Sequence, residues 1–367
     1  MQIMNAFHVF WSSPLEERTC GGNEQPNRGV NLEQKFEDYY LLTFVLSALK
    51  YKDLYPKSRL KLYGDSNVIR YLSEKGLLGC WDVFDDTILD RNIRPGVFDN
   101  SCFYSVGKFF AYREETAPCI LLDVDLVLWN RIDEKTVAEN ALVFTHWEDV
   151  HPQTYWYGTR ESLKLPKEYK LRDEWDFDVM AANTSIVCFN DRKFMEAYTD
   201  EVIRFMENNF VGGTFNIIKP ELLFVEQRLI AMMAKDHGIW EKMTPMIDTV
   251  WSCAQGTFTR EDPRHGPWRF YHPEEREKIT HTWIAKQSIE KNVPYRRYYC
   301  GRMIEHILAL CPGLETTLRQ IKGLEPHFQM LDRYGTTQAM RAVGVATGSL
   351  REVTKDWKEE MPRPQKV

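Results

Sequence analysis

Long hydrophobic runs are missing from this sequence of 367 residues. None approaches the roughly 18 consecutive apolar residues from which a membrane-spanning helix is built. Residues 1–14 also lack the basic start and the small-residue cleavage site of a secretory signal, and residues 7–11 favour a buried strand instead. We therefore expect a protein with no transmembrane segment and a cytoplasmic location.

An excess of positive charge is missing as well. The chain has 47 Lys and Arg against 53 Asp and Glu, for a formal net charge of −6, and its basic residues often stand beside acidic ones. Nucleic-acid-binding domains carry a basic patch or stripe, so we expect no nucleic-acid partner. Because 43% of the residues are hydrophobic, we expect a packed globular protein.

Closely spaced cysteine pairs are a third absence. None of the eight cysteines belongs to a CxxC pair, and several, such as Cys119 and Cys188, stand within apolar runs. Buried thiols in a reducing compartment account for this pattern better than disulfides or a zinc site do.

Strand-like and helix-like stretches alternate through the first two hundred residues, which indicates an α/β sheet. Short apolar runs predict strands at 6–11, 60–63, 81–84, 120–122, 141–145, 184–189 and 278–283. Helical spacing predicts helices at 32–51, 67–75, 102–113, 194–208, 221–235 and 302–310. The interval 147–175 has no clear period and is rich in aromatic residues, so we expect a functional loop or lid there.

Asp123 and Asp125 are the most informative residues. They stand in segment 120–126, Ile-Leu-Leu-Asp-Val-Asp-Leu, where two carboxylates interrupt an apolar run. Burying unpaired charge is costly, so these acids need a strand end, a metal ion or hydrogen-bond donors. Side chains two residues apart share one face of a strand, so both could reach one ligand if the strand extends that far. Carboxylate oxygens suit Mg²⁺ and Mn²⁺, whereas the alternative for so short a pattern is a solvated turn.

The strand with Asp123-Val124-Asp125 resembles the DxD element of GT-A glycosyltransferases. Three later segments follow in the order found in glycosyltransferase family 8 and its relatives. Residues 183–190, Asn-Thr-Ser-Ile-Val-Cys-Phe-Asn, are similar to the family's N-S-G-V-x-x-x-N strand. Residues 226–228, Glu-Gln-Arg, are similar to its D-Q-D, with Arg228 in place of the second acid. Residues 281–286, His-Thr-Trp-Ile-Ala-Lys, are similar to its H-F-x-G-x-x-K segment.

This resemblance implies a GT-A fold, which is a Rossmann-like, doubly wound mixed sheet of the α/β class. We expect a nucleotide-sugar transferase domain at 1–290, a helical C-terminal appendage at 291–346 and a flexible tail at 347–367. The implied activity is that of a hexosyltransferase-like glycosyltransferase (EC 2.4). Such an enzyme transfers a sugar from a nucleotide-diphosphate sugar, by resemblance a UDP-sugar with retention, to a carbohydrate or glycoconjugate acceptor.

The resemblance also assigns roles at the metal site. Asp125 would be the principal ligand of Mn²⁺ or Mg²⁺, with Asp123 shared between the metal and the ribose of the donor. His281 would complete the metal shell, and Lys286 would contact the diphosphate. Lys108, on the helix before the metal strand, would face the donor. For each of the last three residues the alternative is an ordinary packed or surface position.

The remaining candidates belong to the donor and the reacting centre. Phe10, Trp11 and Ser12 end the first strand, where open α/β sheets bind ligands, and Asp65 follows the second strand. Asn183 and Gln227 would hydrogen-bond the sugar. Glu226 or Asp178 would lie near the anomeric carbon, as a base or as a stabiliser of an oxocarbenium-like centre.

Two alternatives remain open at this stage. A sugar nucleotidyltransferase uses the same scaffold, but it carries a glycine-rich basic loop after the first strand. Here residues 12–18 are acidic and contain no glycine. A non-catalytic carbohydrate-binding protein is the other alternative, and the retained acids argue against it.

Overall fold

The computed structural model describes residues 5–12, 36, 38–150, 157–212, 219–248, 250–251, 278–282, 289–290 and 293–335. Its main sheet has seven strands in the order β10-β6-β9-β4-β1-β2-β3. The bounds of these strands are β1 (Asn5–Phe10), β2 (Leu60–Gly64), β3 (Val83–Asp85), β4 (Cys119–Leu122), β6 (Leu142–Phe144), β9 (Ile186–Phe189) and β10 (Met243–Pro245).

Neighbouring strands of this sheet are parallel except where β9 pairs with β4 and with β6. The chain runs from β1 in the middle to β2 and β3 on one side, and then returns to β4 on the other side of β1. This reversal makes the border of β1 and β4 the topological switch point of a doubly wound sheet. The expected α/β class with a doubly wound, mixed sheet is confirmed.

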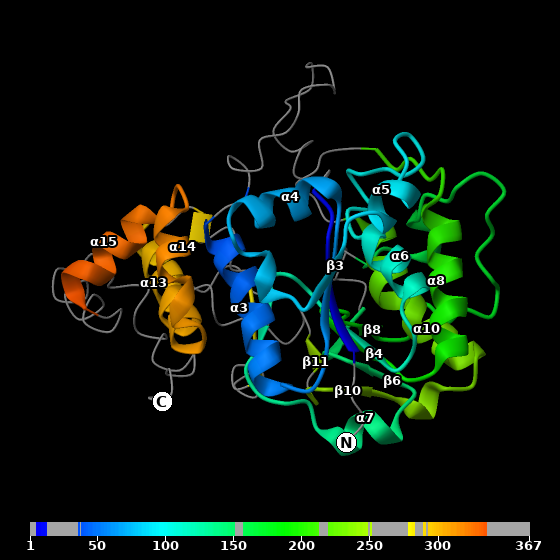
Figure 1. Ribbon diagram of the computed structural model, residues 1–367. Coiled ribbons are helices and arrows are strands. Elements are labelled where there is room, and N and C mark those ends of the chain that lie inside the picture. Colours follow the sequence, from blue (N-terminus) through cyan, green and yellow to red (C-terminus); the bar gives the residue numbers. More distant parts are fainter. Residues whose placement is uncertain are drawn as a thin grey trace.

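Helices cover both faces of the sheet, with α3 on one side and α6, α8 and α10 on the other (Figure 1). The bounds of the α-helices are α3 (Asp38–Leu54), α4 (Ser66–Glu74), α5 (Ile88–Asn92), α6 (Val106–Glu114), α7 (Glu134–Glu139), α8 (Arg192–Met206), α9 (Pro220–Leu223), α10 (Leu229–Asp236), α13 (Val293–Leu310), α14 (Glu315–Gln320) and α15 (Glu325–Tyr334). Short 3₁₀ turns are η1 (Leu78–Cys80), η3 (Arg160–Ser162), η5 (Trp240–Lys242) and η6 (Pro312–Leu314), and η4 (Phe224–Arg228) is a π-helix.

Alternation along the strands divides the interior into two cores. Ala6 and Phe10 of β1 belong to the core that contains α3, whereas Phe7 belongs to the core that contains α6, α8 and α10. Successive side chains of a strand point to opposite faces of the sheet. The short apolar run at the start of the chain therefore anchors both helical layers.

Two smaller sheets extend this framework. β11 (Val250–Trp251), β7 (Trp147–Glu148) and β8 (Ala181–Ala182) form one in that order, and β12 (Ile279–His281) pairs antiparallel with β5 (Leu126–Leu128) in the other. The second pairing brings a segment from near residue 280 to the end of β4.

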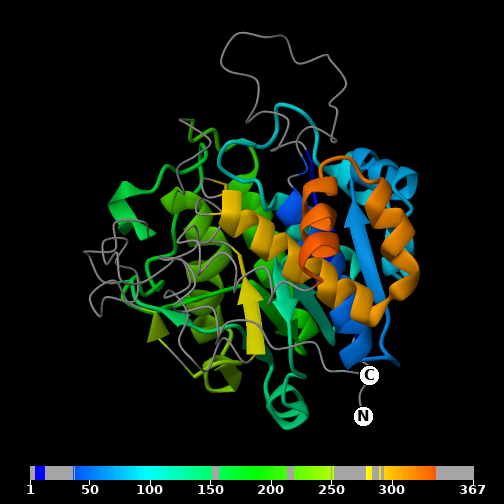
Figure 2. The same cartoon turned by 90° about the vertical axis from the view of Figure 1, so that its left-hand side faces the viewer.

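The C-terminal helices pack on α3, and Figure 2 shows α13 to α15 in front of it. Tyr299 and Met303 of α13 and Phe328 of α15 share a core with Leu42 and Val45 of α3. A domain boundary near residue 290 remains a prediction, and the expected tail at 347–367 lies outside the described residues. No helix of the described part is both long and apolar enough to cross a membrane.

The described part of the interval 147–175 is largely irregular, as expected, apart from β7 and η3, and its role as a lid remains a prediction. Leu163, Tyr169 and Trp175 are buried in the core that contains α8 and α10. Tyr169 donates its hydroxyl to Glu201, and Trp175 Nε1 donates to Asp236 Oδ2 at 2.9 Å. Residues 157–175 are therefore anchored to helices, and 151–156 lie outside the described residues.

Candidate functional site

The switch point collects polar groups at the carboxyl ends of three neighbouring strands. Ser12 follows β1, Asp65 follows β2 and Asp123 follows β4. The buried Asp65 carboxylate accepts the backbone N–H groups of Ser12 at 2.5 Å and of Val68 at 2.9 Å, which caps α4. Burial raises the pKa of Asp65 despite these bonds. Asp65 thus holds Ser12 and the start of α4 in position at the edge where open α/β sheets bind ligands.

Asp123 and Asp125 lie in a tight turn between β4 and β5, and not on a continuing strand. The Asp123 N–H donates to the Ser185 carbonyl at 2.8 Å, and the Leu126 N–H returns to the Asp123 carbonyl at 3.2 Å. The Asp125 carbonyl accepts both the N–H and the hydroxyl of Thr282, at 3.0 and 3.1 Å. The turn is therefore fixed by residues from late in the chain.

His281 reaches Asp125 through the pairing of β12 with β5. His281 is the register partner of Leu126, and its Nε2 lies 3.4 Å from Asp125 Oδ1. Ligand atoms of Asp123, Asp125 and His281 all lie within 4.8 Å of one another. One ion could touch all three residues.

Lys108 on α6 lies beneath the same turn. Its Nζ is 2.6 Å from Asp123 Oδ1 and 3.2 Å from Glu226 Oε1. Burial by itself lowers the pKa of Lys108, but the charges of Asp123 and Glu226 outweigh it and raise that pKa well above the ordinary value. Lys108 is thus a permanent cation inside the switch-point cluster, a name we give to Asp123, Asp125, His281, Lys108 and Glu226.

The charges of the switch-point cluster suit a divalent cation. Three carboxylates face one lysine, which leaves two negative charges without compensation from these side chains. Burial, together with Asp125 and Glu226, raises the pKa of Asp123 against the opposing effects of Lys108 and His281. Two carboxylates and a neutral imidazole form a ligand set that Mn²⁺ accepts. The residues present therefore fit the metal, with Asp123 shared between that metal and Lys108.

Glu226 stands on a π-helical turn that interrupts the helix expected at 221–235. The Tyr198 hydroxyl donates to the carbonyls of Val225 at 2.8 Å and Glu226 at 3.1 Å, which fixes this widened turn. π-bulges occur frequently at functional sites. Lys108, Tyr198 and Glu226 line a cavity of about 10 Å³, which has room for about one water molecule.

Glu148 is a further carboxylate, which the sequence analysis missed, and Tyr157 connects it to Gln227 of the π-helical turn. Buried Glu148 accepts Asn183 Nδ2 at 2.6 Å, lies 3.4 Å from His146 Nε2 and accepts the Tyr157 hydroxyl. Tyr157 also contacts Gln227 Oε1 at 2.6 Å. Burial raises the pKa of Glu148, but these partners outweigh it and hold the pKa below its usual value. The available signal was the polar pair at 146 and 148, directly after the strand expected at 141–145.

The other candidates lie in varied places. The Phe10 side chain packs among Phe36, Tyr40 and Phe44, so only its backbone borders the switch point. Trp11 is half-buried and Asp178 is exposed. Lys286 lies outside the described residues.

Asn183 and Arg228 also have structural partners. Asn183 accepts the Ser185 hydroxyl at 2.6 Å besides donating to Glu148. Arg228, which replaces an acid of the family-8 pattern, donates to the carbonyls of Tyr157, Gly158 and Phe177. It therefore anchors the start of the 157–175 segment.

Comparison with solved structures found distant likenesses. Galactosyltransferase LgtC in complex with donor and acceptor sugar analogs has 10% identity and a TM-score of 0.33, with 66% of this chain and 73% of that chain covered. An active-site mutant of LgtC has 11% identity and a TM-score of 0.32, covering 77% and 96%. The bifunctional IspDF from Campylobacter jejuni has 9% identity and a TM-score of 0.28, covering 68% and 49%.

No curated protein matches the sequence. A family match extends over residues 4–259, which includes the sheet, the DxD turn and the Glu226 helix. The chain belongs to the family of unknown function DUF6734.

Proposed function

We propose that this protein transfers a sugar from a nucleotide-diphosphate sugar to a carbohydrate or glycoconjugate acceptor, with a dependence on Mn²⁺ or Mg²⁺. A UDP-sugar donor and retention of the anomeric configuration belong to the proposal because the sequence resemblance implies both. The observation that carries it is the convergence of Lys108, the Asp123–Asp125 turn, Glu226 and His281 at the switch point. These residues come from four separate segments of the chain. The hydrogen bond from Thr282 to the Asp125 carbonyl, for example, joins residues that are 157 positions apart.

Asp125 and His281 would be the principal metal ligands, with Asp123 as a shared ligand. When bound, the metal would neutralise the diphosphate of the donor and so stabilise the leaving nucleotide. The closeness of the ligand atoms of Asp123, Asp125 and His281, all within 4.8 Å of one another, supports this role.

Lys108 and Glu226 would act on the sugar side of the cluster. Lys108 offsets the repulsion between the carboxylates of Asp123 and Glu226. Its raised pKa keeps it positively charged at neutral pH. Glu226 is thereby available as an anion to stabilise positive charge that develops at the anomeric carbon. Gln227, fixed by Tyr157, and Asn183, fixed by Glu148, would border the sugar as rigid hydrogen-bonding groups.

A thermal-shift screen of nucleotide sugars, each with and without Mn²⁺, tests the donor. A ligand at 100 times its dissociation constant stabilises the folded protein by about 2.7 kcal/mol, and we expect this for a UDP-sugar only when Mn²⁺ is present. Release of UDP from the stabilising donor, with the anomer of the released sugar followed by NMR, then tests turnover and retention.

The outcomes of this experiment separate the alternatives. Nucleotide-sugar synthesis from a nucleoside triphosphate and a sugar phosphate would identify a nucleotidyltransferase. Metal-dependent binding with neither hydrolysis nor transfer would identify a carbohydrate-binding protein. The absence of any metal-dependent shift across the donors would overturn the proposal.

A further inference from the structure

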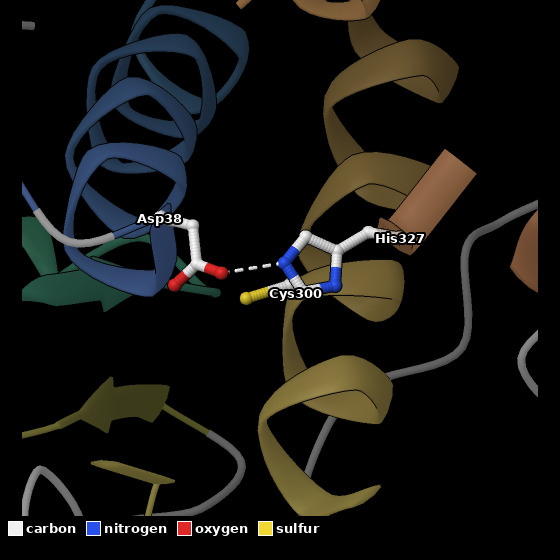
Figure 3. A group of neighbouring side chains, drawn as sticks. All are labelled: Asp38, Cys300 and His327. Carbon is white, nitrogen blue, oxygen red and sulfur yellow. Dashed lines mark hydrogen bonds and ion pairs between the residues drawn. The ribbon is translucent and has the colours of Figure 1, made fainter. Parts of the chain in front are cut away.

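A second group of metal-ligating side chains lies on the opposite side of α3 from the sheet. Asp38 is the first residue of α3, Cys300 lies in the middle of α13 and His327 lies in the first turn of α15. Figure 3 shows the three side chains pointing toward one another. Their ligand atoms all lie within 4.8 Å of one another. We call this group the helix-junction cluster.

The chemistry of this group differs from that of an acidic cluster, because one oxygen, one sulfur and one nitrogen donor meet. Thiolate and imidazole ligands select zinc and related transition metals over Mg²⁺ and Mn²⁺. Cys300 is fully buried and His327 is 3% exposed. Buried sites with such donors are typical of structural zinc, which is shielded from solvent.

The Asp38 carboxylate is oriented by groups outside the cluster. Its Oδ1 accepts the Tyr39 N–H at 2.6 Å and Arg296 Nε at 2.7 Å. Its Oδ2 is thereby turned toward His327, whose Nε2 lies 2.6 Å away. Hydrogen bonds of this kind hold metal-binding side chains in position. Arg296 contacts the oxygen that faces away from His327.

Hydrogen bonding within the protein does not fully satisfy His327. While Nε2 pairs with Asp38, the buried Nδ1 has no hydrogen-bond partner among the described residues. The ring is therefore not part of a closed network of protein groups. Nε2 is the ring nitrogen that faces Asp38, and it is the one that an ion in the cluster would contact.

The geometry requires only a small adjustment for an ion. Zinc binds nitrogen and oxygen at about 2.0–2.2 Å, so tetrahedral ligands stand about 3.3 Å apart. Asp38 Oδ2 and His327 Nε2, now 2.6 Å apart, would separate by roughly 0.7 Å.

We propose that Asp38, Cys300 and His327 bind a zinc-class transition metal that joins α13 and α15 to the start of α3. On binding, the Cys300 thiol loses its proton to solvent and the neutral His327 supplies a ring nitrogen, while the carboxylate of Asp38 is already ionised. One water molecule would occupy the fourth ligand position, as in zinc sites with three protein ligands. The ion has a structural role and acts independently of the proposed sugar transfer.

Cobalt(II) added to metal-free full-length protein tests this site, because a cobalt–thiolate bond gives a near-ultraviolet charge-transfer band. The switch-point cluster contains no cysteine and cannot produce that band. We expect one equivalent of band-forming cobalt in the wild type, displaced by zinc. The band should disappear in Cys300→Ser and persist in Cys311→Ser, a matched cysteine from the end of the same helix, and in Asp125→Asn.

His327→Gln provides a second variant if Cys300→Ser fails to fold. We expect its zinc affinity to fall by at least about 100-fold, since the loss of an outer-shell partner alone costs 10–100-fold. Chelation of zinc from the wild type should lower its Tm, and chelation should have no effect on folded Cys300→Ser. A wild-type protein that gives no thiolate band, or a band that persists in Cys300→Ser, would overturn the proposal.

Discussion

The switch-point cluster and the helix-junction cluster both present three candidate metal ligands, yet they are built in different ways. The first has two carboxylates and an imidazole at the carboxyl end of the central sheet, with Lys108 inserted between Asp123 and Glu226. The second has one carboxylate, a thiol and an imidazole between three helices. The first has three carboxylates against one lysine, whereas the single carboxylate of the second pairs with Arg296, which lies outside that cluster.

The donor atoms and the location differ between the two clusters, and each combination suits a different kind of metal site. Oxygen-rich ligands at the end of a sheet suit a hard cation that keeps substrate phosphates among its ligands. A thiolate inside a helical junction suits a tightly bound ion that stabilises packing. We expect loss of the first site to affect chemistry and loss of the second to affect the stability of the C-terminal helices.

The largest effect should follow Lys108→Met, which removes the cation between the half-buried Asp123 and the buried Glu226. An uncompensated buried charge costs about 3–5 kcal/mol when its partner is removed, so urea unfolding should show a loss of this order. Lys135→Met is the matched control, because its pair with Glu139 is exposed at 3.9 Å and should contribute less than about 1 kcal/mol. Equal losses in both variants would show that Lys108 does not compensate the cluster.

Asp125→Asn should separate the two clusters functionally. Removal of a principal ligand should lower metal-dependent sugar transfer by about 10²–10³-fold, comparable to the loss of a main electrostatic stabiliser. Cys300→Ser should leave the transfer rate unchanged, because Cys300 is not among the residues that we assign to the metal, the diphosphate or the sugar. Steady-state kinetics at saturating Mn²⁺ measure the transfer rate of both variants. A similar loss of rate in the two would show that the two clusters do not have separate roles.

A smaller effect should come from His8, which links β1 to the helix that carries Asp38. Its Nδ1 accepts the Trp81 N–H at 3.0 Å and its Nε2 lies 3.1 Å from Ser47 Oγ, so the ring is neutral with its proton on Nε2. Burial lowers the pKa of His8 from 6.5 to about 3. As the pH falls below 6.5, His8 therefore binds a proton in the unfolded chain but stays neutral in the folded chain down to about pH 3.

The free energy of unfolding should consequently fall by about 1.4 kcal/mol per pH unit below 6.5, or about 2 kcal/mol at pH 5. His8→Gln should lose this part of the acid sensitivity, and His237→Gln, at an exposed position, should retain it. Urea unfolding at pH 7 and pH 5 measures the difference. An unchanged pH slope in His8→Gln would contradict the burial argument.

The smallest effect should come from Tyr198→Phe, which removes the hydroxyl that fixes the π-turn of Glu226. Two carbonyls lose a buried donor, and we expect a loss of about 1–2 kcal/mol in unfolding free energy. Tyr334→Phe, at the end of α15, should stay within about 0.5 kcal/mol of the wild type. If Tyr198→Phe unfolds at the wild-type urea concentration, the π-turn does not depend on this hydroxyl.

Local patterns predicted much of the framework and the first half of the candidate site. Short apolar runs located β1, β2, β4 and β9 to within two or three residues, because a buried strand needs consecutive apolar side chains. Asp123 and Asp125 were visible because charges inside an apolar run are costly and therefore rare. Whether they stand on a continuing strand or in a turn stayed open, because the same spacing suits both.

Residues that depend on long-range contacts were harder to find. Glu148 and Tyr157 stand in an interval without periodicity, and their connection through Gln227 depends on the placement of η4. Cysteine spacing led us to expect no zinc site, because that reasoning considers only neighbours in sequence. Asp38 and His327 are 289 residues apart, and no local pattern relates them.

The sequence by itself determined the α/β class, the approximate order of strands and helices, and the residues able to bind a hard cation. Apolar periodicity and the cost of buried charge act over a few residues, so both can be read along the chain. The family resemblance led us to expect His281 beside Asp125, but the tertiary structure decided that Lys108 lies between Asp123 and Glu226. It also decided that Asp38, Cys300 and His327 meet, since each contact depends on how distant elements pack, and packing is set by the whole core.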